Sequence, residues 1–284
     1  PILPGEDEDH LVSDDAIWTL LARYGITEAN VKILRATVYS HHVRFAARWR
    51  VGRVFLAGDA AHAMPPWIGQ GMSAGVRDAA NLCWKIASVV RGELSDDVLD
   101  SYEAERQPHV RDVTRRAVFA GRFITERRRI LAMMRNPALR AIGRIGPLNA
   151  WLQRSLWIPA AQYPAGFLSE SRPAVGRRLP QPDVLDAHGQ RAKLDDVLGT
   201  GWVVMCLSGA SVPSAWRRTG ARALHIGSDV IDFNGVLISW MRAHNADIVA
   251  LRPDGFIYAA AGAGHTLAPP PASLTITSYI RSNA

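Results

Sequence analysis

Asp59 is the side chain of this sequence best placed to hold a ligand through hydrogen bonds. It follows the apolar run 54–57 and Gly58, a residue at which the backbone can turn tightly. Such a run is typical of a fully buried parallel strand, and open α/β sheets bind ligands beyond the carboxyl ends of their strands. A carboxylate there can accept hydrogen bonds from the hydroxyls of a ribose-like chain. The alternative is that Asp59 caps a helix, since Asp is a favoured capping residue.

A stiff loop follows Asp59 and leads into a helix. Pro65 and Pro66 fix two φ angles and remove two backbone donors. The glycines of the stretch 69–72 then let N–H groups approach a ligand closely. We expect this loop to open into a helix whose positive end favours an anion. The residues expected to form the site are Gly58, Asp59, Pro65, Pro66, Gly69, Gln70, Gly71 and Met72.

The helix after this loop is expected to bury an apolar stripe against the rest of the domain. Its members recur at helical spacing and are Val76, Ala79, Ala80, Cys83, Ala87 and Val90. Cys83 and Cys206 are therefore predicted to be small core residues, because neither stands at a CxxC or metal-ligand spacing.

The stretch 54–85 suits a flavin, because a ribityl-binding carboxylate, a proline wall and a helix amino terminus meet in it. It resembles the second FAD motif of the single-component flavin aromatic hydroxylases of the p-hydroxybenzoate hydroxylase type. That motif continues here through Asp78-Ala79, Asn81-Leu82 and Trp84-Lys85. Three later segments look most like 3-(3-hydroxyphenyl)propionate hydroxylases, namely residues 161–168, 194–199 and 244–260. The resemblance thus covers nearly the whole chain.

This resemblance implies a role for each site residue. Asp59 would take the ribityl hydroxyls, the amides of residues 69–72 the pyrimidine edge of the flavin, and Pro65 and Pro66 would line the ring where oxygen reacts. The implied reaction is FAD-dependent, NAD(P)H-using hydroxylation by dioxygen of a small phenolic substrate such as 3-(3-hydroxyphenyl)propionate. No catalytic side chain is assigned, because the flavin supplies the chemistry. His62 and His109 are expected to be structural.

The implied fold class is α/β, comprising the carboxyl-terminal part of a flavin monooxygenase of the FAD/NAD(P)-binding type and then a thioredoxin-like α/β domain. A dinucleotide-binding unit needs a strand, G-x-G-x-x-G and a helix within about 30 residues. The nearest candidate, residues 262–264, lacks the third glycine. We therefore expect a carboxyl-terminal portion, inactive alone, whose partners are the missing amino-terminal portion and, in a homodimer, a second copy of the enzyme.

The expected domains follow from the same resemblance and from composition. They are a tail of the substrate-binding domain at 1–45, the carboxyl-terminal part of the FAD-binding domain at 46–168, a Ser/Pro/Gly/Arg-rich linker at 169–182 and the thioredoxin-like domain at 183–284. Without a CxxC motif, that last domain is expected to be structural rather than redox-active.

Two other functions stay open. A related flavin epoxidase, halogenase or reductase shares the Gly-Asp motif, although the thioredoxin-like extension favours the phenol hydroxylases. A non-catalytic remnant or assembly module, binding a partner through the carboxyl-terminal domain, would account for the absent dinucleotide motif.

Periodicity predicts the elements that position these residues. The amino-terminal half should contain a helix from Asp14-Asp15 to Gly25, a strand within 31–43, and a long helix from Ser95 to about Met134 that breaks at Asn136-Pro137. The carboxyl-terminal part should contain strands at 202–207, 247–251 and 256–260, helices at 216–222 and 236–244, and a hairpin turn at Pro253-Asp254-Gly255.

Composition argues against several function classes. The 284 residues are 48% hydrophobic, yet no apolar run approaches the ~20 residues that span a bilayer, so we expect a cytoplasmic protein without a membrane partner. The formal charge of +7 comes mostly from arginine, which we assign to genome composition rather than to nucleic-acid binding. Adjacent residues of a strand point to opposite faces, so His41 and His42 are not expected to bind a metal together.

Overall fold

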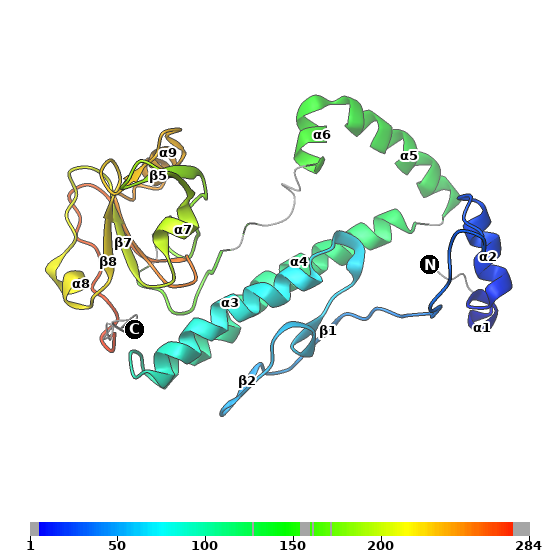
Figure 1. Ribbon diagram of the computed structural model, residues 1–284, viewed down its shortest axis with the longest axis horizontal. Helices are drawn as coiled ribbons and strands as arrows, with labels where there is room; N and C mark the ends of the chain where they lie inside the picture. Colours follow the sequence, from blue (N-terminus) through cyan, green and yellow to red (C-terminus); the bar gives the residue numbers. More distant parts are fainter. Residues whose placement is uncertain (1–5, 127, 154–159, 161, 171, 275–284) are drawn as a thin grey trace.

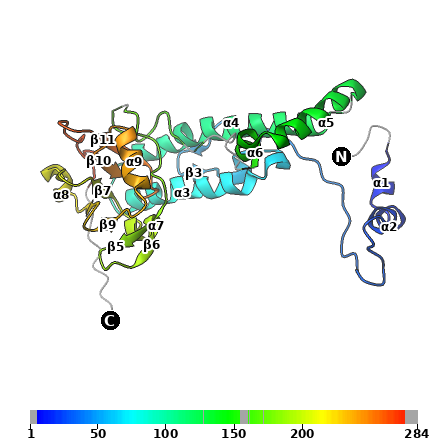
Figure 2. The same cartoon turned by 90° about the horizontal axis from the view of Figure 1, so that it is seen from above.

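The computed structural model describes residues 6–126, 128–153, 160, 162–170 and 172–274. Two long helices form its centre, α3 (Gly71–Val90) and α4 (Ser101–Ile124), which lie side by side and are joined through the 3-10 turn η3 (Asp96–Asp100) (Figure 1, Figure 2). A sheet-containing unit packs at one end of this pair. The outer ends of the predicted first and last domains, residues 1–5 and 275–284, lie outside this description.

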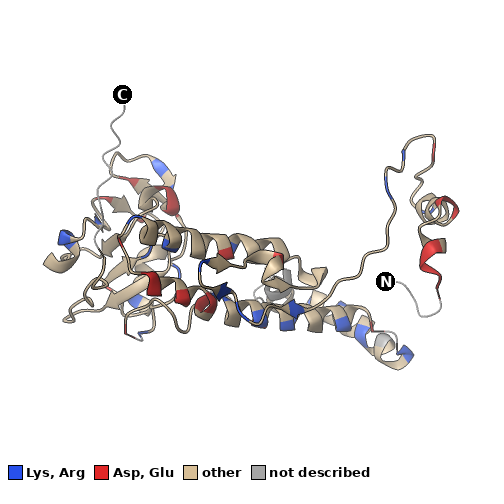
Figure 3. Cartoon of the chain, turned by 90° about the horizontal axis from the view of Figure 1, so that it is seen from below, with Lys and Arg blue, Asp and Glu red and all other residues tan. Residues whose placement is uncertain are grey.

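The amino-terminal region contains the predicted helix but lacks the predicted strand. After the single turn α1 (Glu8–Leu11), α2 (Asp14–Ala22) begins at the N-cap Ser13, whose hydroxyl accepts a hydrogen bond from the Ala16 amide. Both helices carry acidic residues in their first turn (Figure 3). Residues 31–43 form no strand; pairing starts at β1 (Arg44–Phe45), antiparallel to β4 (His62–Ala63). The reason is that 31–43 is largely exposed and finds no ladder partner among the described residues.

The apolar run 54–57 is not the buried parallel strand that its composition predicts. Only β3 (Val54–Phe55) is a strand, and it pairs antiparallel with β2 (Arg50–Val51). Gly52, at φ +59°, lies in the tight turn between β2 and β3, so β3 pairs antiparallel with the segment just before it in the sequence. Val54 is consequently 66% exposed.

The buried face of α3 is the polar one, contrary to expectation. Its buried residues are Ala74, Asp78, Asn81, Leu82, Lys85 and Ser88. On the predicted apolar stripe, by contrast, Val76 is 62% and Val90 81% exposed, and Cys83 is exposed too. The prediction was wrong because charged groups on α3 meet opposite charges on other elements, which makes their burial tolerable.

The second long helical stretch is two helices rather than one. α4 ends at Ile124, where the Thr125 amide and hydroxyl both donate to the Gly121 carbonyl, and α5 (Arg129–Arg144) follows. Pro137 lies inside α5 and does not end it: the helix runs on to Arg144 and is followed by α6 (Gly146–Gln153). The predicted break at Asn136-Pro137 is therefore wrong, although an interior proline lacks a donor and crowds the preceding turn.

A four-stranded sheet forms the core of the carboxyl-terminal unit, in the order β11-β10-β7-β8. β7 (Val203–Cys206) is parallel to β8 (Arg222–His225) and antiparallel to β10 (Ile248–Leu251), which pairs with β11 (Ile257–Ala261). The remaining elements are β5 (Asp183–Asp186), β6 (Arg191–Lys193), α7 (Leu194–Leu198), α8 (Ser214–Arg218), β9 (Val230–Ile231) and α9 (Val236–Ala243). The strands predicted at 202–207, 247–251 and 256–260 and the helix predicted at 236–244 are confirmed, and the thioredoxin-like assignment stays a prediction. The helix predicted at 216–222 is shorter than expected, because α8 ends at Arg218 and Arg222 begins β8.

The two faces of this sheet belong to two hydrophobic clusters. Val203 and Met205 of β7 pack with α7 and α9 residues, whereas Val204 and Cys206 face the cluster that also contains residues of α3 and α4. One face of the sheet therefore packs on the central helix pair.

The stretch 169–182 does not behave as the linker that its composition predicts. Ala174, Val175 and Leu179 are buried in the same cluster as α7 and α9. The chain here is tied to the sheet, because the Gly176 amide donates to the Ile257 carbonyl and the Ile257 amide to the Arg177 carbonyl. Polar composition failed as a guide because a few small apolar residues suffice to anchor a short segment.

Candidate functional site

The turn at Gly58 and Asp59 presents a free carboxylate. It forms the 3-10 turn η1 (Gly58–Ala60), in which Gly58 has φ +56° and lies so close to α3 that a Cβ on Gly75 would be 3.4 Å from its Cα. Asp59 is exposed, and no donor of the described residues reaches its carboxylate. It lines a hollow of about 420 Å³ with His41 and His42. Since the N-cap position of η1 is Ala57, Asp59 does not cap this turn.

Asp78 holds this turn from the buried side of α3. Its Oδ2 accepts a hydrogen bond from the Gly58 amide at 3.0 Å and lies 2.6 Å from His62 Nε2, while its Oδ1 accepts from Arg106 Nε at 2.9 Å. Burial opposes ionisation, but the bond to His62 and the charge of Arg106 outweigh it, so the pKa of Asp78 is lowered. The turn is thus fixed by a charge-assisted hydrogen bond, and His62 is the hydrogen-bonded structural group that was predicted.

The amino terminus of α3 is uncapped. The N-cap residue Gln70 makes no side-chain capping bond, and the first turn contains no acidic residue. Gly69, at φ +63°, ends the preceding turn, and Met72 is 83% exposed. The first amides of a helix have no partner within it, so this end of α3 can bind a partial or full negative charge.

The proline turn between η1 and α3 is pinned on α4. Pro65 is buried and Pro66, which begins η2 (Pro66–Ile68), is exposed. Trp67 of η2 packs into a notch at Gly121 of α4, where a Cβ would lie 2.3 Å from Trp67 Cδ1. The site loop is therefore supported by both central helices.

A second buried charge cluster surrounds Glu105 of α4. Its Oε1 accepts from Arg252 Nη1 and from the Phe167 amide, both at 2.7 Å. Its Oε2 accepts from Asn81 Nδ2 at 2.6 Å, Lys85 Nζ at 2.8 Å and Arg252 Nη2 at 2.9 Å. Burial opposes its ionisation, but Arg252 and Lys85 together lower the pKa of Glu105 to about 2. The carboxylate is thereby kept charged at the junction of the helix pair and the carboxyl-terminal unit.

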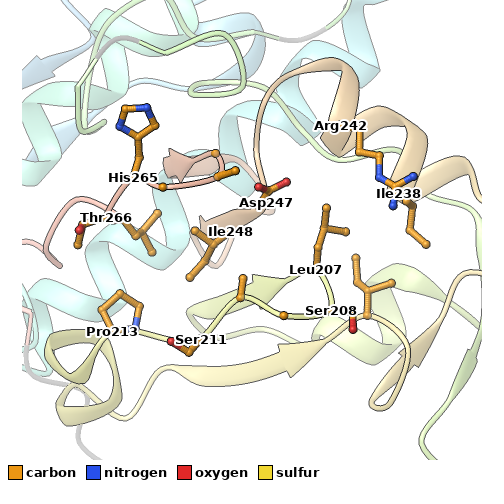
Figure 4. A pocket seen from close by; sticks show the side chains of 17 residues that line it. Leu207, Ser208, Ser211, Pro213, Ile238, Arg242, Asp247, Ile248, His265 and Thr266 are labelled. Atoms are coloured by element: carbon orange, nitrogen blue, oxygen red, sulfur yellow. The ribbon is translucent and has the colours of Figure 1, made fainter.

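A hollow of about 780 Å³ opens at the carboxyl ends of β7 and β8 (Figure 4). Its lining includes Ser208, Ser211, Asp247 and His265. Cys206, at the end of β7, is fully buried, and burial raises the pKa of its thiol to about 11. Dithiol exchange needs an accessible thiolate and a resolving cysteine, so this hollow is not a dithiol centre.

Two further features of the described residues bear on function. Among them, no group of three or more His, Cys, Asp or Glu side chains is arranged to hold a metal ion. None of the described helices has the length and apolar character needed to cross a membrane.

The site residues named from sequence lie on consecutive elements, and the structure brings the Gly58–Asp59 turn against the first turns of α3. Sequence reasoning missed their buried supports, which are Asp78, Arg106, Glu105 and Arg252. One signal was available: Asp78, Asn81 and Lys85 recur at helical spacing and mark a polar stripe on α3. Nothing local indicated that this stripe is buried.

Two family models match this chain. Residues 4–117 match the FAD binding domain and residues 176–270 match the HcaD C-terminal domain. Among curated proteins, a 3-(3-hydroxy-phenyl)propionate/3-hydroxycinnamic acid hydroxylase of Burkholderia vietnamiensis is 35% identical over 91% of this chain and 53% of its own length. The hydroxylase of that name from Escherichia coli K12 is 34% identical over 92% and 52%. The chain thus spans about half the length of the curated relatives it matches.

Solved structures agree with these matches. BexE, an oxidation enzyme of BE-7585A biosynthesis, has a TM-score of 0.66 and 26% identity over 96% of this chain and 53% of its own. OxyS anhydrotetracycline hydroxylase from Streptomyces rimosus has a TM-score of 0.65 and 25% identity over 88% and 50%. Aklavinone-11 hydroxylase, solved with FAD and aklavinone, shares the fold at 22% identity and a TM-score of 0.64 over 90% and 48%.

Proposed function

We propose that this chain forms the ring-facing half of a flavin site in an FAD-dependent aromatic hydroxylase of the p-hydroxybenzoate hydroxylase type, the class that its FAD binding domain match and its curated relatives support. The enzyme would hydroxylate a small phenolic substrate such as 3-(3-hydroxyphenyl)propionate, with NAD(P)H as reductant and dioxygen as oxidant. The names of the curated relatives support this substrate class.

The residues of the site fit a flavin. Asp59 offers an unbonded carboxylate for the ribityl hydroxyls, and the amides of residues 69–72 offer donors to the pyrimidine edge. Pro65 and Pro66 would line the ring. Bound FAD would supply the electron transfer and oxygen activation. The protein's own part is to orient the ring, to place positive helix charge beside it and to exclude water.

One observation carries this proposal. The Gly58 amide is tied to buried Asp78 while Asp59, the next residue, is exposed and unbonded. A structural aspartate would use its carboxylate within the protein, whereas the Asp59 carboxylate is left available on a backbone turn that the Gly58–Asp78 bond fixes. A fixed backbone beneath an unbonded acceptor suits a binding site, because little conformational entropy is then lost when the ligand binds.

We further propose that an amino-terminal portion of the same enzyme covers the outer face of α3. The apolar residues Val76 and Val90 are exposed on that face, together with Cys83. A contiguous apolar helix face of this kind is typical of an interface. The domain bounds 1–45, 46–168 and 183–284, the homodimer and cytoplasmic residence remain parts of this proposal.

Turnover of 3-(3-hydroxyphenyl)propionate by the enzyme containing this chain tests the proposed reaction. NADH and NADPH would each be supplied, and oxygen uptake and product mass would be followed. We expect a product heavier by one oxygen atom, formed only with FAD present. Oxidation of the nicotinamide without any hydroxylated product from a panel of phenols would contradict the proposal.

A further inference from the structure

Two buried charge clusters lie next to each other on the same pair of helices. The first, around Asp78 and Arg106, holds the Gly58 turn. The second is centred on Glu105, the residue immediately before Arg106 on α4, and includes Asn81, three residues after Asp78 on α3. Each helix therefore carries residues of both clusters within a single turn, Asp78 and Asn81 on α3 and Glu105 and Arg106 on α4. A movement of α4 that displaces Glu105 must also displace Arg106.

Arg252 is the contribution of the carboxyl-terminal unit to the second cluster. Its guanidinium is fully buried and forms a two-bond pair with Glu105, at 2.7 and 2.9 Å, and another with Asp254, at 3.0 and 2.5 Å. It also donates to the Phe167 carbonyl at 3.0 Å. Both carboxylates are buried, so Arg252 is the cation that makes their close approach tolerable.

The Glu105 side chain cannot move toward Gly166, because the two are already in close contact. Gly166, at φ +130°, lies so close that a Cβ there would be 2.2 Å from Glu105 Cγ. Lys85, which donates to Glu105, is also fixed by Asn81 Oδ1 at 2.9 Å and by Ser101 Oγ at 2.7 Å. Without Arg252, Glu105 and Asp254 would share a buried site with Lys85 as their remaining cation, and α4 would have to shift to bring a carboxylate to water.

We propose that Arg252 is a positioning residue for the flavin-binding turn, acting through Glu105 and the adjoining Arg106–Asp78 pair on Gly58. The carboxyl-terminal unit, which has no dithiol centre, thus contributes to cofactor binding by fixing the positions of α3 and α4 through the Arg252–Glu105 contact. The consequence for FAD rests on the proposed function, whereas the mechanical link between Arg252 and Gly58 does not.

Amide hydrogen exchange on the apoprotein tests the link directly. In Arg252→Met we expect exchange in peptides covering 54–64 to accelerate about three- to tenfold, the usual size of such couplings. Arg252→Lys keeps the positive charge but lacks the planar guanidinium that forms two bonds to one carboxylate. Its exchange rate at 54–64 should lie between those of Arg252→Met and the wild type. Arg222→Met is the matched control, because the Arg222 guanidinium donates to the Val197 carbonyl within the carboxyl-terminal unit; its exchange at 54–64 should equal that of the wild type.

If Arg252→Met fails to fold, Asn81→Ala replaces it, since this change removes the 2.6 Å bond to Glu105 without removing a charge. Unchanged exchange at 54–64 in the variant that is measured, with faster exchange confined to peptides from 244–260, would overturn the proposal and leave Arg252 as a docking residue only.

The second measurement is FAD affinity of the enzyme containing this chain, with the visible spectrum of bound flavin as a readout besides turnover. We expect Arg252→Met to raise the dissociation constant about three- to tenfold and to alter the flavin spectrum, with Arg222→Met unchanged. Unchanged affinity and spectrum would contradict the role toward FAD. Failure of the wild type to bind FAD would instead refute the proposed function, and the exchange result would still decide the link.

Discussion

Trp67 packs against Gly121 at a distance that excludes any side chain at position 121, since a Cβ there would lie 2.3 Å from the indole. This contact ties the proline turn of the site to α4. Gly121→Ala should therefore destabilise the protein by about 1–3 kcal/mol, the cost of overpacking. Gly143→Ala in α5, where the added methyl group meets no atom within 4 Å, is the control and should be neutral or stabilising. Thermal unfolding measures both; equal melting temperatures would contradict the packing described.

Asp59→Ala should weaken FAD binding by about 1–3 kcal/mol in the enzyme that contains this chain, because ribityl hydroxyls would lose their charged acceptor. Stability should hardly change, since Asp59 is exposed and caps no helix. Asp112→Ala, which removes an exposed carboxylate paired with Arg116 on α4, is the control for lost charge. If Asp59→Ala lowered the melting temperature and left the flavin content unchanged, the proposed role of Asp59 in FAD binding would be contradicted.

This chain by itself should bind FAD weakly, with a dissociation constant above about 1 μM. It offers ribityl and ring contacts, but its sequence has no glycine-rich pyrophosphate loop, so a large share of the charge-assisted hydrogen bonds is missing. Quenching of flavin fluorescence on titration gives the constant. Purification of a yellow protein with stoichiometric FAD would show that the cofactor is held mainly by these residues.

The two thiols should differ sharply in reactivity. Cys83 is exposed, whereas Cys206 is buried and burial raises its pKa to about 11. A thiol reagent at neutral pH should label Cys83 in this chain by itself, folded, and reach Cys206 only after unfolding, because the thiolate is the reactive form. Cys83→Ser should abolish native labelling. Rapid labelling of that variant in its folded state would reopen a redox role for the carboxyl-terminal unit.

Glu105 should make stability fall in acid. Its native pKa is about 2, against an ordinary value of 4.5, so between these values the unfolded chain binds the proton and the native protein does not. Its ionic contribution is complete above the ordinary value and is lost as pH falls toward 2. The gap in unfolding free energy between wild type and Glu105→Gln should therefore narrow below about pH 4.5, as measured by urea unfolding. A gap independent of pH would contradict this account.

The sequence by itself determined the residues of the candidate site, because they are contiguous and each carries a local signal. Gly58 is needed for a positive φ, the prolines stiffen the loop, and residues 69–72 precede a strongly periodic helix. It also determined β7, β10 and β11 of the carboxyl-terminal unit, because each is a short, continuous apolar run typical of a buried strand. The polar strands β5 and β6 and the strands β8 and β9 were not predicted.

Tertiary structure alone decided which face of α3 is buried and what holds the site in place. Apolar periodicity favoured the face of Val76 and Val90, yet Asp78 and Lys85 point inward because Arg106 and Glu105 meet them there. Arg252 lies 147 residues from the carboxylate that it pairs with. The burial energy of a charged side chain depends on the charges opposite it, and residues so distant in sequence become neighbours only when the chain has folded.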